Sequence, residues 1–253
     1  MDFVLTCDLD WASEPCIETL LAIAARFGVR PTVFVTHESA AVRRAADARR
    51  AEVGVHPNFL PGSTHGDSIE AVLDHVLALA PGARSIRGHR HHTSPEIERA
   101  AASRGLTLDS NGCRLLAPDL RPEPLPSGLL RLPVFFEDDL HWEAGRSWRF
   151  ADCAPVFFSP GLKVLDVHPF FVALNIPDAA AYARCKPLIP TLTAAQAAGL
   201  RHSGAGAGTF LVEALTGILA AGHRFVTLGE LADGLDLGRS TPRQAGQARG
   251  GRG

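Results

Sequence analysis

The sequence contains no block of like charges, no long apolar stretch and no CxxC pair. Its formal net charge is −2 and it shows no basic stripe, which argues against a nucleic-acid partner. Its apolar runs are far shorter than the roughly 18 residues that a membrane-spanning helix needs. The N-terminus begins with strand-like residues rather than with a charged and then apolar signal segment, so we expect a cytoplasmic protein.

Two further absences narrow the function. The 5 cysteines are an odd number without close spacing, which argues against a zinc ribbon or a redox pair. We expect these thiols to be buried in a protein of a reducing compartment. The first strand is not followed by GxGxxG or by GxxxxGK(S/T), so nucleotide binding of those two kinds is not expected.

Short strand-like runs alternate with helix-like runs along most of the chain, which predicts an α/β fold with a parallel sheet. The expected strands are 2–8, 32–36, 52–56, 84–87, 106–110, 129–136, 162–168 and 224–228. Apolar residues at helical spacing predict helices over 17–27, 69–77, 96–104, 179–185 and 209–221. This pattern favours a barrel of the TIM kind, or a close variant, over an open doubly wound sheet.

The chain is expected to form one domain over residues 1–237. Within it, the segment 111–127 contains four prolines and is expected to be an irregular loop over one end of the barrel. Residues 238–253 are rich in glycine and arginine and are expected to form a disordered tail.

Acidic residues and histidines gather where the expected strands end. Asp8 and Asp10 end the first strand on one face, where two carboxylates repel unless a cation or a basic group lies between them. His56 ends the third strand, and His65 follows in a flexible loop that can fold back towards it. Asp10, His56 and His65 would supply the ligands of a catalytic divalent-metal site with open positions. Taken singly, an aspartate here can cap a helix and a histidine can be structural.

Two later strands add charged groups. Arg87 ends the fourth strand, and a buried arginine can hold a carboxylate ionised and fix its direction. Asp166 and His168 share one face of the strand 162–168. A histidine at that position could supply a proton near neutral pH.

The motifs Thr6–Asp10, Glu52–Asn58, Ser85–His89, Leu129–Asp139, Val167–Pro169 and Gly222–Leu231 follow one another in a specific order. In this order they resemble the polysaccharide deacetylase family with the NodB-homology domain, in its Asp-x-Asp subgroup. The resemblance extends from residue 2 to about residue 235.

The resemblance implies a distorted TIM-like (β/α)7 barrel that hydrolyses N-acetyl groups on a sugar or glycan precursor. It also implies one divalent metal ion, with zinc expected and nickel, cobalt or iron as alternatives. Carried over by position, Asp8 is the general base, and Asp10 and His56 are metal ligands. Arg87 orients Asp8, and His168 is the general acid.

The sequence departs from the family pattern at the second metal histidine. In the family this histidine lies one helical turn after the first, where the present chain has Leu60. His65 is the nearest downstream histidine, and we expect it to complete the metal site, with His89 as the next candidate.

The residue that orients His168 is not fixed by the sequence. Asp138, Asp139 and Asp166 are all candidates, and we count Asp139 among the catalytic residues. Trp11 or Trp142 could form one wall of the cleft, although either could instead pack in the core. Two other functions remain open: hydrolysis of cyclic amides or ureides, and an inactive barrel that binds carbohydrate.

Overall fold

The computed structural model describes residues 1–235, so the expected tail, residues 238–253, lies outside the described residues. The strands are β1 (Asp2–Asp8), β2 (Thr32–Val35), β3 (Glu52–Val55), β4 (Ser85–Ile86), β5 (Leu108–Asp109), β6 (Glu123–Pro124), β7 (Leu130–Arg131), β8 (Phe136–Glu137), β9 (Val164–Val167) and β10 (Arg224–Val226). They form one sheet in the order β6-β7-β5-β4-β3-β2-β1-β9-β8, and β10 also pairs with β1. Within the described residues, β6 and β7 are antiparallel and the other strand pairs are parallel.

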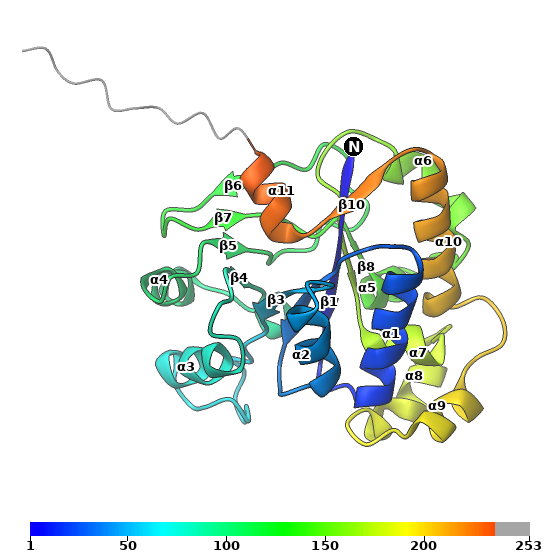
Figure 1. Cartoon of the computed structure of the whole chain (residues 1–253), viewed down its shortest axis with the longest axis horizontal. Coiled ribbons are helices and arrows are strands. Elements are labelled where there is room, and N and C mark those ends of the chain that lie inside the picture. Colours follow the sequence, from blue (N-terminus) through cyan, green and yellow to red (C-terminus); the bar gives the residue numbers. More distant parts are fainter. Residues whose placement is uncertain (236–253) are drawn as a thin grey trace, which may run out of the picture.

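One extended segment connects the two sides of this sheet. Its first part, β7, pairs with β5, and its last part, β8, pairs with β9. Between them, the backbone N–H of Leu132 donates to Asp109 and that of Phe135 donates to Val164. The sheet therefore curls into a distorted barrel, as the sequence predicted (Figure 1).

The α-helices are α1 (Glu14–Arg26), α2 (Ala40–Asp47), α3 (Ile69–Leu79), α4 (Pro95–Ser103), α5 (Asp138–Glu143), α6 (Ala154–Phe157), α7 (Pro169–Leu174), α8 (Ala179–Cys185), α9 (Ala194–Leu200), α10 (Ala207–Ala220) and α11 (Leu228–Gly234). Three 3₁₀ turns are η1 (His89–His91), η2 (Phe150–Asp152) and η3 (Lys186–Leu188). Helix α1 buries a stripe that includes Ile17 and Leu20. Each such side chain contributes about 1.5–3 kcal/mol when it leaves water. Helix α7 packs against both α1 and α10, and the three helices lie close together in Figure 1.

The expected elements are confirmed with two differences. The five expected helices and seven of the eight expected strands form near their predicted positions. The expected strand 129–136 is divided into β7 and β8, because this segment crosses from one side of the sheet to the other. The segment 111–127, expected to be irregular, contains β6. Short helices such as α2, with 8 residues, and α7, with 6 residues, were not predicted, since each is shorter than the window of about 11–18 residues over which helical periodicity is read.

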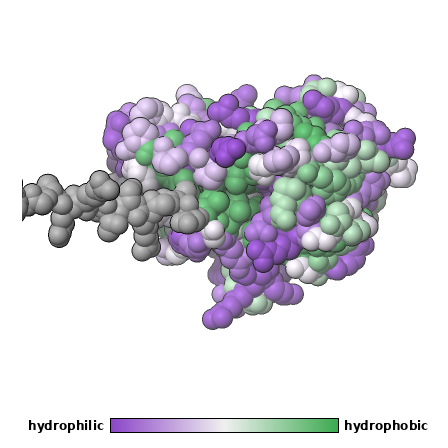
Figure 2. Space-filling model, turned by 90° about the horizontal axis from the view of Figure 1, so that it is seen from above, coloured by the Kyte–Doolittle hydropathy of each residue, from purple (hydrophilic) through white to green (hydrophobic). Residues whose placement is uncertain are grey.

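The surface is largely polar. Among the described residues, the large hydrophobic side chains that stand exposed are Met1 at 43% and Leu200 at 44%. Figure 2 shows hydrophilic and apolar side chains intermixed on the face where β1 begins. All 5 cysteines are free, and four of them are buried, as expected for small apolar side chains. Within residues 1–235, no helix combines the length and apolar character needed to cross a membrane.

Replacement of Gly54 by alanine should destabilise the fold. A Cβ at Gly54 would lie 2.5 Å from Ser85 Oγ and 2.7 Å from the ring of Phe34, and overpacking of this kind costs about 1–3 kcal/mol. Urea denaturation of Gly54→Ala should show this loss. Gly199→Ala is the matched control, because Gly199 lies in α9 with no atom within 4 Å of the new methyl, and it should be neutral or stabilising. Equal stability of Gly54→Ala and wild type would contradict the prediction.

Candidate active site

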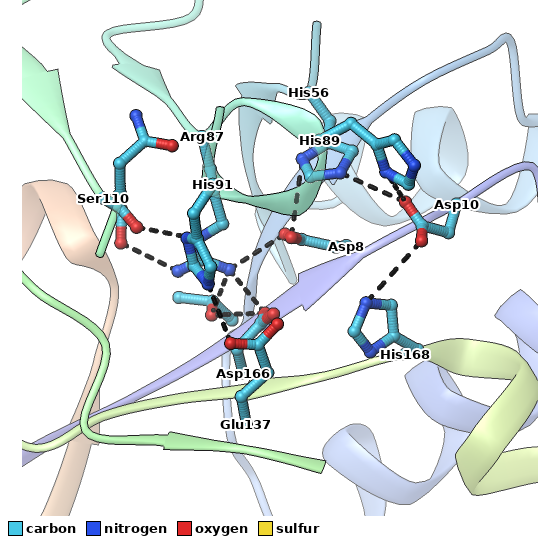
Figure 3. A network of polar contacts seen from close by, with 12 residues as sticks. Asp8, Asp10, His56, Arg87, His89, His91, Ser110, Glu137, Asp166 and His168 are labelled. Atoms are coloured by element: carbon cyan, nitrogen blue, oxygen red, sulfur yellow. Dashed lines mark hydrogen bonds and ion pairs between the residues drawn. The ribbon is translucent and has the colours of Figure 1, made fainter. Parts of the chain in front are cut away.

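The carboxyl end of β1 places two aspartates on either side of one histidine. His56 directly follows β3, where its backbone N–H donates to Val35 of β2. Its Nδ1 lies 3.4 Å from Asp8 Oδ2, and its Nε2 lies 3.1 Å from Asp10 Oδ1. Neighbouring parallel strands therefore bring these three predicted residues together (Figure 3).

His89 supplies a second imidazole at the same carboxylate. It begins η1 three residues after the end of β4, and its Nδ1 lies 3.0 Å from Asp10 Oδ1. The turn is tight, because a Cβ at Gly88 would collide with the carbonyl oxygen of His92. The backbone N–H of Gly88 donates to Asn111 Oδ1 at 2.9 Å, which fixes the start of the turn.

The donors around Asp10 fit a divalent cation. Ligand atoms of Asp10, His56 and His89 all lie within 4.8 Å of one another. Both ring nitrogens of His56 are buried and lie near carboxylates, but among the described residues neither forms a hydrogen bond, which is costly for a polar side chain. Burial raises the pKa of Asp10, but its contacts with His56 and His89 outweigh burial and hold this pKa well below the usual range. A carboxylate beside two imidazoles is a common donor set for zinc and related ions.

His65, which the sequence placed in the metal site, is engaged elsewhere. The backbone N–H of Asn58 donates to its Nδ1 at 3.1 Å, so its proton lies on Nε2, which donates to Thr36 O at 2.8 Å. Its ring stacks on that of His75 at 5.0 Å between centroids. Both ring nitrogens are therefore used by the backbone, and the group of ligand atoms around Asp10 includes His89 and not His65.

The turn that presents Asp10 has a strained backbone. Asp10 has φ 43° and Trp11 has φ 55°, a left-handed conformation that costs of the order of 1–3 kcal/mol for a residue other than glycine. The backbone N–H of Trp11 donates to Thr36 Oγ1 at 3.1 Å. The half-buried ring of Trp11 meets His89 edge-on at 5.3 Å, so it forms a wall beside the candidate metal ligands. Trp142 packs instead against Phe171.

Arg87 is fully buried and binds two carboxylates. Its Nη1 donates to Asp8 Oδ1 at 2.9 Å and also contacts Asp166 Oδ1. The other side of the guanidinium donates to the backbone oxygen and the hydroxyl of Ser110, and its carbon lies 4.4 Å from the centroid of the Phe34 ring. Burial raises the pKa of Asp8, and Arg87 opposes that rise. The expected contact of Arg87 with Asp8 is present, and Asp166 is its second partner.

His168 is held by Asp138. The carboxylate of Asp138 accepts hydrogen bonds from His168 Nδ1 at 2.7 Å and from the backbone N–H of His168 at 2.8 Å. Burial opposes a charge on the ring, but Asp138 outweighs it and raises the pKa of His168 well above its usual value. The Nε2 atom lies 3.8 Å from Asp10 Oδ2. Asp139, which the sequence analysis counted as catalytic, instead accepts a hydrogen bond from Leu140 N. The residue that orients His168 is therefore Asp138 and not Asp139.

A second histidine–carboxylate pair in the site was not predicted. His91 Nε2 donates to Glu137 Oε2 at 2.7 Å, while His91 Nδ1 accepts from Gly112 N at 3.2 Å. Glu137 and Asp166 are partners in the register of β8 and β9, so their side chains lie next to each other (Figure 3). The alternation of side chains along these two strands could have predicted that Glu137 faces the site. Such a prediction also requires the pairing of the two strands, which the sequence does not give.

Replacement of Arg87 by methionine should destabilise the protein, since Asp8 and Asp166 would stay buried without their cation. Removal of one partner of a buried ion pair costs about 3–5 kcal/mol. The loss should be largest at neutral pH and smaller at mildly acidic pH, because Asp8, whose pKa burial already raises, can then take up a proton. Denaturation at the two pH values measures this, with Arg87→Lys as the charge-retaining control. A loss that does not change with pH would contradict the explanation.

The chain is similar to known polysaccharide deacetylases in sequence and in fold. Residues 5–186 match the family described as WbmS-like: Polysaccharide deacetylase. A Bordetella bronchiseptica protein described as a polysaccharide deacetylase involved in O-antigen biosynthesis (WbmS) is 28% identical, with a TM-score of 0.77 over 85% of this chain and 89% of that chain. No curated protein matches the chain.

More distant solved structures share the fold. A protein from Mycobacterium smegmatis, described as a polysaccharide deacetylase, is 16% identical with a TM-score of 0.54, over 98% of this chain and 96% of that chain. A family 4 acetyl xylan esterase from Clostridium thermocellum, solved with a cobalt ion, is 13% identical with a TM-score of 0.51, over 92% and 91%. The barrel is thus of the NodB type, and the chain belongs to the WbmS-like polysaccharide deacetylase family, as a hydrolase of C–N amide bonds.

Proposed function

We propose that this protein is a metal-dependent hydrolase that removes an N-acetyl group from a sugar or glycan precursor. In this proposal Asp10, His56 and His89 hold one divalent ion, and His89 takes the place that the sequence analysis gave to His65. The observation that carries the proposal is that Asp10 Oδ1 lies 3.1 Å from His56 Nε2 and 3.0 Å from His89 Nδ1. The candidate acid His168 faces the other oxygen of the same carboxylate.

The bound ion would act as a Lewis acid that polarises the amide carbonyl and makes a water molecule more acidic. Zinc is our first choice for the ion. Nickel, cobalt and iron are alternatives, because this donor set does not discriminate strongly among these metals. We also keep the expectation of a cytoplasmic protein, which the five free thiols support.

Asp8 is proposed as the general base. Arg87 binds its Oδ1, which fixes the direction of the carboxylate and leaves Oδ2 on the side of His56. Asp8 would take a proton from water as the water oxygen bonds to the carbonyl carbon. A positioned base of this kind contributes about a hundred- to ten-thousandfold in rate.

His168 is proposed as the general acid. Asp138 holds its Nδ1–H, which leaves Nε2 directed towards Asp10 and able to deliver a proton. The proton would pass to the amide nitrogen as the C–N bond breaks, giving acetate and the sugar amine. The Asp138–His168 pair resembles the acid–histidine pairs that orient an imidazole in other hydrolases.

The metal assignment predicts which variants lose the ion. Protein purified without a polyhistidine tag should contain about one divalent ion per chain, and dialysis against a chelator should abolish activity. His56→Ala and His89→Ala should lose the ion, because each removes an imidazole from Asp10. His92→Ala is the control, because His92 is exposed in the same loop and outside the donor group. Full metal content in His89→Ala, measured by mass spectrometry, would overturn the ligand assignment.

A substrate screen tests the reaction itself. Acetylated sugars, sugar nucleotides and cyclic amides should be compared, with release of acetate and ring opening as separate readouts. Asp8→Asn and His168→Ala should each lose about a hundred- to ten-thousandfold in acetate release. The rate of acetate release should fall far more in Asp138→Asn than in Asp139→Asn. Asp138, and not Asp139, accepts a hydrogen bond from the ring of His168.

The screen also decides between the alternatives. Ring opening without acetate release would favour the cyclic amide or ureide hydrolase. Sugar binding without turnover in a metal-loaded protein would favour the inactive carbohydrate-binding barrel.

A further inference from the structure

A row of aromatic rings runs from helix α3 on the surface to the candidate metal ligands. Successive ring centroids in this row are 5.0, 5.4, 5.3 and 5.5 Å apart, in the order His75, His65, Trp11, His89 and His56. His75 is exposed, whereas His65 and His56 are buried. The row therefore links the surface to the metal ligands through side-chain packing alone.

His65 is the member of this row that hydrogen bonds to the backbone hold in place. It is only 4% exposed, and both of its ring nitrogens bind backbone groups of two different loops, one after β2 and one after β3. The acceptor role of Nδ1 requires a neutral ring. Burial favours the same state, since it lowers the pKa of His65 to about 4. The ring is thus held in one place and one tautomer at neutral pH.

Trp11 depends on this support. The left-handed conformations of Asp10 and Trp11 are unfavourable, and such residues persist where surrounding contacts hold them. Two contacts do so here: Trp11 N–H donates to Thr36 Oγ1, and the Trp11 ring lies against that of His65. Thr36 also accepts the hydrogen bond from His65, so Thr36 and His65 together hold the turn from one side.

We propose that His65 is a positioning residue that holds the Asp10–Trp11 turn, and through Trp11 the ring of His89, in the arrangement that binds the metal ion. It touches neither substrate nor metal. The inference rests on the proposed function, because it concerns the site formed by Asp10, His56 and His89. It gives His65 a role in metal affinity without making it a ligand.

The test is the affinity for cobalt(II), measured by competition with a chelator, together with the visible absorption spectrum of the bound ion. His65→Ala and Trp11→Ala should each weaken binding by about 10–100-fold, the range seen when a supporting residue is lost. Trp11→Phe should bind close to wild type, because a ring remains between His65 and His89. The double variant His65→Ala/Trp11→Ala should be little weaker than either single variant, since both remove the same support.

His65→Asn is a second variant, for the case that His65→Ala does not fold. Its amide oxygen can still accept the Asn58 N–H, but it lacks the ring that supports Trp11, so it should also weaken cobalt binding. Circular dichroism of the metal-free variants checks folding, and His92→Ala is the binding control.

Two outcomes overturn the inference. Wild-type affinity in folded His65→Ala and His65→Asn would show that the ring is not needed. A loss in His65→Ala as severe as in His89→Ala, and additive with Trp11→Ala, would make His65 a ligand. If the wild type binds no cobalt, the proposed function fails and the inference with it, whereas tight binding by wild type and His65→Asn alike overturns the inference alone.

Discussion

The buried guanidinium of Arg87 is the interaction on which the rest of the site depends. It lies directly after β4 and contacts Asp8 on β1, Asp166 on β9 and Ser110 after β5, with the ring of Phe34 from β2 against its face. Strands from both halves of the curled sheet are thus fixed around one cation. Its planar group with several donors suits this role better than a lysine would. The direction of the Asp8 carboxylate, on which its proposed role as a base depends, follows from this contact.

Negative charge exceeds fixed positive charge at this end of the barrel. Asp8 and Asp166 share the single guanidinium of Arg87, while Asp138 is paired with His168. Among the described residues, the ion-pair partners of the Asp10 carboxylate are the imidazoles of His56, His89 and His168. Carboxylates this close together repel each other unless cations lie among them, so a divalent ion at Asp10 would balance part of the excess. The same electrostatics that make the metal-free site costly would therefore favour binding of the ion.

Much of the arrangement could be predicted from the sequence. Parallel strands end at one edge of a barrel, so polar residues at strand ends, such as Asp8, His56, Arg87 and His168, were expected to meet, and the structure brings them together. The barrel itself could also be predicted, because strands that alternate with helices along the chain are compatible with few other architectures.

The sequence-based predictions differ from the structure where tertiary contacts determine the position of a side chain. The loop before His65 could have folded towards Asp10, but hydrogen bonds to the backbone of Thr36 and Asn58 hold the ring away, and no spacing rule encodes them. The choice of Asp138 over Asp139 depends on the residue at which α5 begins, and helix starts are uncertain by a residue or two in any sequence pattern.

The edges of the curled sheet bear on how the protein is expected to behave in concentrated solution. Open sheets present unpaired backbone groups along their outermost strands, and these groups can recruit other chains into aggregates. Here the two ends of the strand order, β6 and β8, are each two residues long, and β10, which among the described strands pairs with β1 alone, is three residues long. β6 includes Pro124, which has no N–H to donate, and β8 runs directly into α5. Strands this short offer little template for strand addition, which disfavours edge-to-edge association of this incompletely closed barrel.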